Sequence, residues 1–473
     1  MKAIKYVLMG VLLAGFSATA NAQVEELNAA LEGIKAKAPN AAELAKIAYK
    51  KNKKNAEALV KIGRAFYELN DTAKAKEFAE YADVASKHKN AEAFILLGDI
   101  AQHANDGGLA SNQYQQAMLA EPTNWQSYYK YALVNRKVSP KSAEDALERM
   151  RANCKDVNVD AVKGHIFYLA NNLKDSYNAY SKAPIESLDK DYLLEYAPVC
   201  FLTGNFDDGL KAVKRGLELE PRNAKFNRFG MMFNAELKNF EEAEKYSNAF
   251  FNNSDSAKVT DIVNFYSGIV SEGVGKNDIA LDYYLKTLDM ITDSSLITTP
   301  QVYQKIINVY KANKDFPNAI SYHEKFTNSK DKKSFEDAEG LANLYSKYAE
   351  EQEQVKKEEL TIKAAEVYRN AGEEFDFQKV YARYKAASTL FSLDRDMKRG
   401  LANADYQAII DLVGNKADRT DPETQMLKTS YNYMMFYNLN KGKAGIPTAK
   451  EFANKILEID PNFESAIKIK ELK

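Results

Sequence analysis

The side chains able to bind a metal ion or act as a catalytic base are few in this sequence. No two of its four histidines are spaced as in an H-x-x-x-H or H-E-x-x-H motif, which places two ligands on one helix face. The two cysteines, Cys154 and Cys200, also have no close partner in the sequence. We therefore expect no metal site, no cofactor site and no catalytic residue. The histidines are His88, His103, His165 and His323.

One stretch, Gly273-Val274-Gly275-Lys276, has the composition of a phosphate-binding loop. A P-loop needs four residues between its glycines and a serine or threonine after the lysine. Here one residue separates the glycines, and Asn277 follows the lysine. The stretch also follows a helical pattern instead of a strand. We therefore expect a turn between helices, and a protein that is not an enzyme.

The spacing of small and aromatic residues repeats along the chain. Counting from Gly98, a small residue follows after 12 residues (Ala110) and an aromatic residue after 16 (Tyr114). Counting from Gly164 gives Tyr180 at the same 16-residue distance. Similar sets begin near residues 63, 98, 132, 164, 197, 230, 268 and 307, in steps of 32 to 39 residues. A period of this length is typical of stacked supersecondary units.

Each repeat is long enough for two short helices. A small residue lets two helices approach closely where they cross, and a large aromatic side chain fills the adjoining space. Polar or glycine-bearing turns between paired helices are expected at 69–71, 203–205 and 314–315. One unit cannot bury its apolar face alone, so neighbouring units must stack into a quasi-linear array.

This pattern resembles the tetratricopeptide repeat (TPR) family. The resemblance rests on the small residue of the first helix, an aromatic three residues later, the small–aromatic–small set of the second helix and a closing proline such as Pro122 or Pro221. It implies an all-α fold, an α-solenoid of about eleven antiparallel helix pairs wound as a right-handed superhelix. The repeat is weaker around Ala132, where Asn135 replaces the aromatic, and around Gly230, where the second-helix set is one residue out of step.

The chain is expected to begin with a secretory signal peptide. Lys2 and Lys5 precede a short apolar run, and Ala20-Asn21-Ala22 forms the small-residue pattern that is cleaved after Ala22. Phe16 stands where a lipoprotein leader needs cysteine, so no lipid anchor is expected there. The expected segments are a signal peptide at 1–22, a helical pair at 23–54, a regular TPR array at 55–330, and looser TPR-like pairs with a C-terminal capping helix at 331–473.

The leader and the composition together suggest where the protein works. An exported protein would be periplasmic, associated with the outer membrane or extracellular. The formal net charge is −1, and the absence of a basic excess argues against a nucleic-acid partner. No later stretch is long and apolar enough to span a membrane, so the mature protein is not expected to cross one.

Two covalent questions stay open at the level of the sequence. Export permits a disulfide, but cysteine is also a common small buried side chain, and nothing in the helical patterns forces Cys154 and Cys200 together. Thr72 and Ser256 lie in D-S/T-A patterns that resemble O-glycosylation sites of exported Bacteroidota proteins, although chance matches are expected with this many aspartates. The chain as a whole resembles envelope TPR proteins of that phylum.

In TPR proteins, residues one turn either side of the first-helix small residue line a groove that binds peptides. The resemblance thus implies a non-enzymatic scaffold or adaptor of the bacterial cell envelope that binds a peptide or protein segment in this groove. The alternative is a glycan- or nutrient-binding envelope protein, a class that typically carries a lipobox cysteine and Trp-lined sugar sites. Phe16 and the single tryptophan, Trp125, disfavour it. The candidate groove residues are Arg64, Tyr67, Asp99, Gln102, Tyr129, Arg136, Gln304, Asn308 and Lys311.

Overall fold

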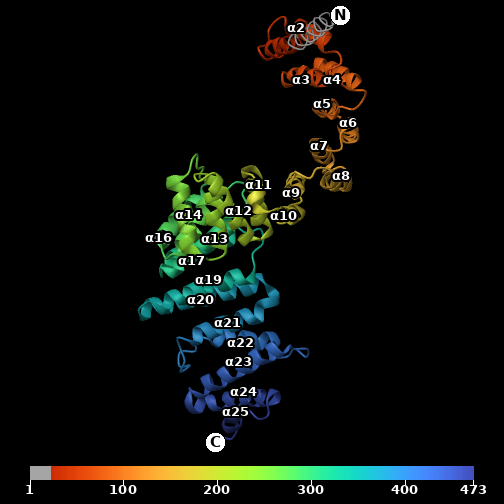
Figure 1. Cartoon of the computed structure of the whole chain (residues 1–473). Helices are drawn as coiled ribbons and strands as arrows, with labels where there is room; N and C mark the ends of the chain where they lie inside the picture. Colours follow the sequence, from red (N-terminus) through yellow and green to blue (C-terminus); the bar gives the residue numbers. More distant parts are fainter. Residues whose placement is uncertain (1–22, 473) are drawn as a thin grey trace, which may run out of the picture. The chain divides into compact units, whose positions relative to one another are not determined.

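The computed structural model describes residues 23–472, and the expected signal peptide at 1–22 lies outside that range. Within the described residues, the regular elements are α-helices and three short 3-10 helices (Figure 1). Apart from an isolated bridge between Asn223 and Asp255, no β-structure occurs in this part of the chain. The expected all-α solenoid is confirmed.

Contacts divide the chain into two compact units that share helix α14 (Phe240–Asn253). The expected change from regular to looser repeats, between residues 330 and 331, falls inside the second unit. A large core cluster of that unit begins at Phe335 and extends to Ile469. Among the described residues, the first unit consists of residues 23–237 and Asn248–Ala257, and the second of Lys238–Ser247 and residues 258–472.

The first unit holds six helix pairs, followed by helix α13. In the first pair, the Asn52 amide donates a hydrogen bond to the Gln23 carbonyl, 3.3 Å away, and so links α2 to the helix over residues 23–35. The elements are the helix over 23–35 with α2 (Ala41–Asn52), α3 (Ala56–Glu68) with α4 (Thr72–Ser86), α5 (Ala91–His103) with α6 (Gly107–Ala120), α7 (Trp125–Asn135) with α8 (Pro140–Asn153), α9 (Val159–Leu169) with α10 (Leu173–Tyr180), η1 (Ile185–Ser187), α11 (Lys190–Thr203) with α12 (Phe206–Leu219), and α13 (Ala224–Glu236).

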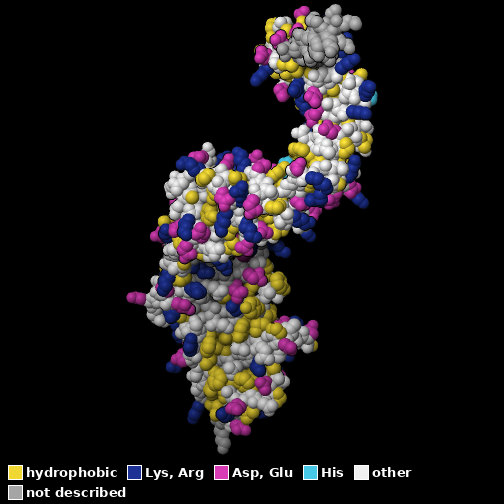
Figure 2. All heavy atoms as spheres, in the orientation of Figure 1, with side chains coloured by type: hydrophobic (Ala, Val, Ile, Leu, Met, Phe, Trp, Pro, Cys, Tyr) yellow, Lys and Arg dark blue, Asp and Glu magenta, His cyan; other side chains and the backbone are white. Residues whose placement is uncertain are grey.

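The second unit holds five pairs and a terminal helix. Eleven pairs therefore lie within single units of the described residues, and α13 with the shared helix α14 is a twelfth in the helix order, where about eleven were expected. On the face seen in Figure 2, hydrophobic side chains gather over α21 to α24. The elements are α15 (Asp261–Gly273) with α16 (Asn277–Leu288), α17 (Thr299–Ala312) with α18 (Phe316–Asn328), α19 (Phe335–Glu350) with α20 (Gln354–Glu374), η2 (Asp376–Gln378), α21 (Lys379–Phe391) with α22 (Asn403–Val413), α23 (Asp421–Leu439), η3 (Gly442–Gly445), α24 (Ile446–Ile459) and α25 (Glu464–Lys470).

Asparagine recurs as the N-cap of the first helices in the first unit. The side chain of Asn55 accepts a hydrogen bond from the Ala58 amide, and Asn90 does the same for Ala93. Such caps satisfy backbone N–H groups that have no partner within the helix. Asn124, before α7, accepts from the amide of Gln126. The capping residues therefore fix where successive first helices begin, and so align their N-terminal ends.

The turns between paired helices also depend on specific backbone geometry. Asn70 (φ 62°) and Asn105 (φ 59°) adopt the left-handed conformation that asparagine tolerates better than most residues. Each is followed by an aspartate, Asp71 or Asp106, that caps the second helix. Gly204 (φ 74°) takes the same place before α12. The turns expected at 69–71 and 203–205 are thus present.

The repeated glycine and tyrosine pack against each other. A Cβ atom added to Gly98 would lie 2.4 Å from the Tyr114 ring, and one added to Gly164 would lie 2.6 Å from the Tyr180 ring. Both tyrosines are fully buried. At the α12–α13 contact the roles are reversed, because Gly209 of a second helix receives the ring of Phe233 from the next first helix. The small–aromatic spacing therefore records close helix packing.

First helices of successive pairs also contact one another in the first unit: α3 contacts α5, α5 contacts α7, α7 contacts α9, and α9 contacts α11. Each second helix, by contrast, packs between its own first helix and the first helix of the next pair, as α4 does between α3 and α5. We call the surface formed by these first helices the inner face of the first unit. It is the face that the resemblance assigns to partner binding.

Three chemical features can be stated for the described residues. No helix among residues 23–472 is long and apolar enough to cross a membrane. No group of three or more histidine, cysteine or acidic side chains in the same range is placed to hold a metal ion. Cys154 and Cys200 are both buried and free, so the structure contains no bridge between them.

Candidate functional site

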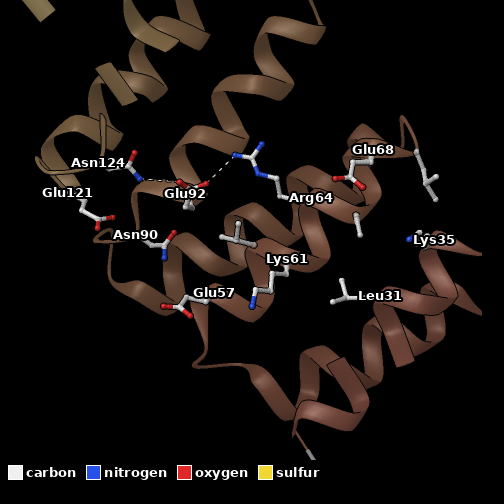
Figure 3. Close-up of a pocket in the computed structure, with 13 residues that line it drawn as sticks. Leu31, Lys35, Glu57, Lys61, Arg64, Glu68, Asn90, Glu92, Glu121 and Asn124 are labelled. Carbon is white, nitrogen blue, oxygen red and sulfur yellow. Dashed lines mark hydrogen bonds and ion pairs between the residues drawn. The ribbon is translucent and has the colours of Figure 1, made fainter. Parts of the chain in front are cut away.

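A pocket of about 740 Å³ opens on the inner face of the first unit. We call it the N-terminal pocket. It lies within the size range of small-molecule and cofactor sites. Figure 3 shows its lining side chains converging from the helix over 23–35, from α3, and from the starts of α5 and α7. The lining residues are Leu31, Lys35, Glu57, Val60, Lys61, Arg64, Ala65, Glu68, Leu69, Asn90, Glu92, Glu121 and Asn124.

The N-terminal pocket has two chemically different ends. At one end, which we call the acidic end, Glu57, Glu92 and Glu121 lie with the amides of Asn90 and Asn124 near the N-terminal ends of the first helices (Figure 3). At the other end, Leu31 and Lys35 come from the helix over 23–35 (Figure 3). An apolar contribution also comes from Val60, Ala65 and Leu69 of the lining. The pocket therefore offers both charge and apolar contact.

Arg64 links the pocket lining to the buried carboxylate of Asp99. Its guanidinium lies 2.6 Å from Asp99 and 3.3 Å from Glu92. The Asn124 amide donates a second hydrogen bond to Glu92, at 3.1 Å. Glu92 is thereby held by groups from α3 and from the start of α7. Of the predicted groove residues in the first unit, Arg64 is the one that lines this pocket.

Asp99 is the centre of a buried polar network instead of an open groove residue. Only 6% of its surface is exposed. It accepts hydrogen bonds from Lys130 at 2.7 Å and from the Tyr114 hydroxyl at 2.8 Å, besides that from Arg64. A buried carboxylate is costly unless it is paired and hydrogen-bonded, and here three donors satisfy it. Asp99 therefore ties α3, α5, α6 and α7 together.

Tyr67 and Gln102 belong to the same network. The Tyr67 hydroxyl donates to the backbone carbonyl of Asp99 at 3.2 Å, and Gln102 accepts from the Tyr114 hydroxyl at 3.1 Å. Burial, with the negative charge of Asp99, raises the pKa of both Tyr67 and Tyr114. The two hydroxyls therefore stay protonated at neutral pH and act as hydrogen-bond donors. The structure thus brings four of the predicted residues, Arg64, Tyr67, Asp99 and Gln102, into one cluster.

Tyr129 lies in a second network on the inner face. Its hydroxyl is 3.1 Å from Nε2 of His165, whose Nδ1 is 2.8 Å from Glu195. Tyr180 donates its hydroxyl to the same carboxylate at 2.7 Å. The order hydroxyl, imidazole, carboxylate is that of a nucleophile, a base and an orienting group. Burial and the charge of Glu195 raise the pKa of Tyr129, so its hydroxyl stays protonated at neutral pH.

The aromatic side chains around this network form a row across three successive first helices. The Tyr129 ring stacks on His165, with centroids 5.9 Å apart and planes 25° apart. Trp125 precedes it at 6.0 Å, and Tyr192 follows His165 at 5.8 Å. Such contacts rigidify the inner face from α7 to α11. The network is therefore a positioning element for that face.

Arg136 lies at the far end of α7 and is bound to backbone groups. Its guanidinium donates to the carbonyls of Leu133 at 2.5 Å and Leu169 at 3.4 Å, and so connects α7 to the end of α9. It also lines a smaller pocket of about 280 Å³ with Lys137 and Glu144. Arg136 is not part of the N-terminal pocket. The prediction that it contacts a partner remains untested.

The three remaining predicted residues, on α17, belong to the second unit. The Gln304 amide donates to Asn308 at 3.4 Å. Gln304 and Lys311 line a pocket of about 600 Å³ with His323, whose side chain is 7% exposed. Burial lowers the pKa of His323, and Gly340 lies directly against its ring, so the side chain packs between helices. Asn308 is outside this pocket's lining.

Most of the residues that line the N-terminal pocket were not predicted from the sequence. Lys35, Glu57, Lys61, Glu92 and Glu121 were not among the predicted groove residues, because the prediction counted only one turn either side of the small residue. A signal for part of the site does exist in the sequence. The tetrapeptide Asn-Ala-Glu-Ala occurs at 55–58 and again at 90–93, so a capping asparagine is followed two residues later by a pocket glutamate in both repeats.

Comparisons with known proteins found similar structures among those that have been solved. No protein-family model matches the sequence, and no curated protein matches it. Similar solved structures include the C-terminal part of a TPR repeat-containing protein from Cytophaga hutchinsonii, 20% identical, with 59% of this chain and 100% of that chain covered and a TM-score of 0.40. The chain is an α-solenoid of paired helices, as its own helix order and contacts show.

Two further similar structures are also TPR proteins. A tetratricopeptide repeat protein from Parabacteroides merdae is 14% identical, with 54% of this chain and 98% of that chain covered and a TM-score of 0.32. YrrB, described as a TPR protein with an unusual peptide-binding site, is 16% identical, with 50% and 96% covered and a TM-score of 0.26. All three structures are described as TPR proteins, the family that the repeat pattern resembles.

Proposed function

We propose that this protein is a non-enzymatic scaffold of the bacterial cell envelope that binds a peptide segment of a protein partner in the N-terminal pocket. The observation that carries the proposal is the pocket itself, about 740 Å³ in volume and lined by both charged and apolar side chains. Lys35, Glu57, Lys61 and Glu68 are exposed there. A peptide offers backbone groups, charges and apolar side chains together, and this mixture suits such a lining.

The hydrogen bonds and ion pairs that hold the lining side chains in place support a binding role for the pocket. A site whose side chains are already held in place loses less conformational entropy when a ligand binds. Arg64 and Glu92 are fixed by Asp99 and Asn124 before any partner arrives. We therefore expect a partner segment to meet a preformed surface.

The glycan-binding alternative has less support at this pocket. Its lining contains no aromatic side chain among the described residues. Trp125, the single tryptophan, is 38% exposed and lies outside the lining. Sugar sites of the class considered are typically lined by tryptophan. The peptide proposal is therefore preferred, and its place in the envelope rests on the signal-like segment at 1–22.

The test is selection of displayed random peptides against purified residues 23–473. Selected peptides should lose affinity by at least about tenfold for Ala65→Arg, because a long side chain on the pocket wall would fill it. Val84→Arg is the matched control, since Val84 is 70% exposed on second helix α4. Thermal unfolding should show that both variants fold. No selected peptide, or equal binding by wild type and Ala65→Arg, would contradict the proposal.

A further inference from the structure

Acidic side chains outnumber cations along the pocket lining, because Glu57, Glu68, Glu92 and Glu121 share it with Lys35, Lys61 and Arg64. Arg64 is shared between Asp99 and Glu92, so it offers only part of its charge to the pocket. Glu57 and Glu121 are exposed, and neither forms an ion pair within residues 23–472. A bound group that is positively charged would therefore find unpaired acceptors at this end of the pocket.

Among these carboxylates, Glu121 has the strongest need for a cationic partner. Glu57 and Glu92 lie in the first turns of α3 and α5, where a negative charge is already stabilised by the positive end of the helix dipole. Glu121 instead follows the last residue of α6, next to the negative end of that helix. The last turn of α6 contains no basic residue. A cation beside Glu121 would offset both charges, which is the pairing helix ends favour.

We infer that the peptide segment bound by the N-terminal pocket carries an arginine or lysine side chain that lies at the acidic end, with neighbouring apolar side chains against the apolar part of the lining, which includes Leu31, Val60 and Leu69. This inference rests on the proposed function and adds the chemistry of the partner. Arginine suits the site better than lysine, because its planar guanidinium can bond two carboxylates at once. The apolar contact supplies the part of the binding that salt does not screen.

The experiment uses an arginine-containing peptide obtained by the selection described above. Its arginine is replaced by citrulline, which keeps the shape and removes the charge. We expect citrulline to lower the affinity for residues 23–473 about threefold to tenfold, as for a partly exposed charge pair. For Glu121→Gln the loss on citrulline replacement should shrink, because the two changes remove the same interaction. Glu43→Gln is the matched control, since Glu43 is exposed in the first turn of second helix α2.

The outcomes separate this inference from the proposed function. A smaller citrulline effect in Glu121→Gln, with Glu43→Gln equal to wild type, supports the inference. Selected peptides without any basic residue, or a citrulline effect that Glu121→Gln leaves unchanged, overturn it. If those peptides still lose binding to Ala65→Arg, the proposed function stands alone. If no peptide is selected at all, both the proposed function and this inference are contradicted.

Discussion

The ring of Tyr114 lies against the backbone of Gly98 so closely that a Cβ atom at position 98 would be 2.4 Å from the ring. The same relationship joins Gly164 to Tyr180 at 2.6 Å and Gly268 to Tyr284 at 2.5 Å. In each of these helix pairs the tyrosine comes from the second helix and the glycine from the first helix. This contact sets how closely the paired helices approach, and it holds the inner face in place.

The first prediction concerns that contact. Gly98→Ala should destabilise the α5–α6 pair by about 1–3 kcal/mol, because the added methyl group must displace a buried ring. Hydrogen exchange measured by mass spectrometry reports the α5–α6 segment separately from the rest of the array. Faster exchange in α5 and α6 is expected.

Gly108→Ala serves as the control for Gly98→Ala. A Cβ atom at Gly108 would meet nothing closer than 3.6 Å, and Gly108 lies at the start of the same second helix, α6. Alanine there should be neutral or stabilising by up to about 1 kcal/mol. If Gly98→Ala exchanged no faster than Gly108→Ala, close packing at Gly98 would be refuted.

The second prediction concerns the buried carboxylate of Asp99. Asp99→Asn keeps the size of the side chain but removes the charge that Arg64 and Lys130 contact, so a loss of about 1.5–3 kcal/mol is expected. Chemical unfolding in urea measures it. Asp145→Asn is the control, because Asp145 is exposed on α8. A loss no larger than that of the control would show that the network does not stabilise the fold.

The third prediction concerns alkaline pH. The hydrogen bond to Asp208 raises the pKa of Tyr177 to about 12, and burial raises that of Tyr192 to about 12. Because the folded protein holds these hydroxyls neutral, their contribution to stability is complete below pH 10 and is lost as the pH rises towards 12. Ultraviolet titration should therefore show tyrosines that ionise late. All tyrosines ionising together near pH 10 in the folded protein would contradict this.

The fourth prediction concerns the two cysteines. Burial raises the pKa of the Cys154 thiol, and raises that of Cys200 to about 12. Since the thiolate is the reactive form, native protein should react slowly with a thiol reagent. Protein unfolded without reductant should show two free thiols per chain. Fewer than two would indicate a disulfide and contradict the structure.

The fold was largely predictable because it follows from residue spacings within single repeats. The 16-residue distance from Gly98 to Tyr114, and the asparagines that begin helices and turns, are visible in the sequence itself. At the α12–α13 contact the small and aromatic residues exchange their usual roles, since the glycine is Gly209 of a second helix and the ring is Phe233 of the next first helix. The periodicity could not show that α14 would be shared between two compact units, because that depends on contacts summed over many residues.

The site was less predictable because surface position does not fix a side chain's partners. Asp99 was expected in the groove, but its position brings it within reach of Lys130 and Tyr114, which lie 31 and 15 residues away in the sequence. Glu121 lies in a turn after α6, and the repeat spacing does not indicate that this turn belongs to a binding site. Which polar residues pair beneath a surface and which stay open on it depends on three-dimensional distances that one sequence does not contain.

Mapping where a selected peptide binds tests the central claim most directly. The peptide would carry a benzophenone group, be crosslinked by light to residues 23–473, and the attached residues be identified by mass spectrometry. The account predicts attachment around the N-terminal pocket, on the helix over 23–35, α3 and the start of α5. Attachment confined to the outer surface of the second helices or to the second unit would contradict it.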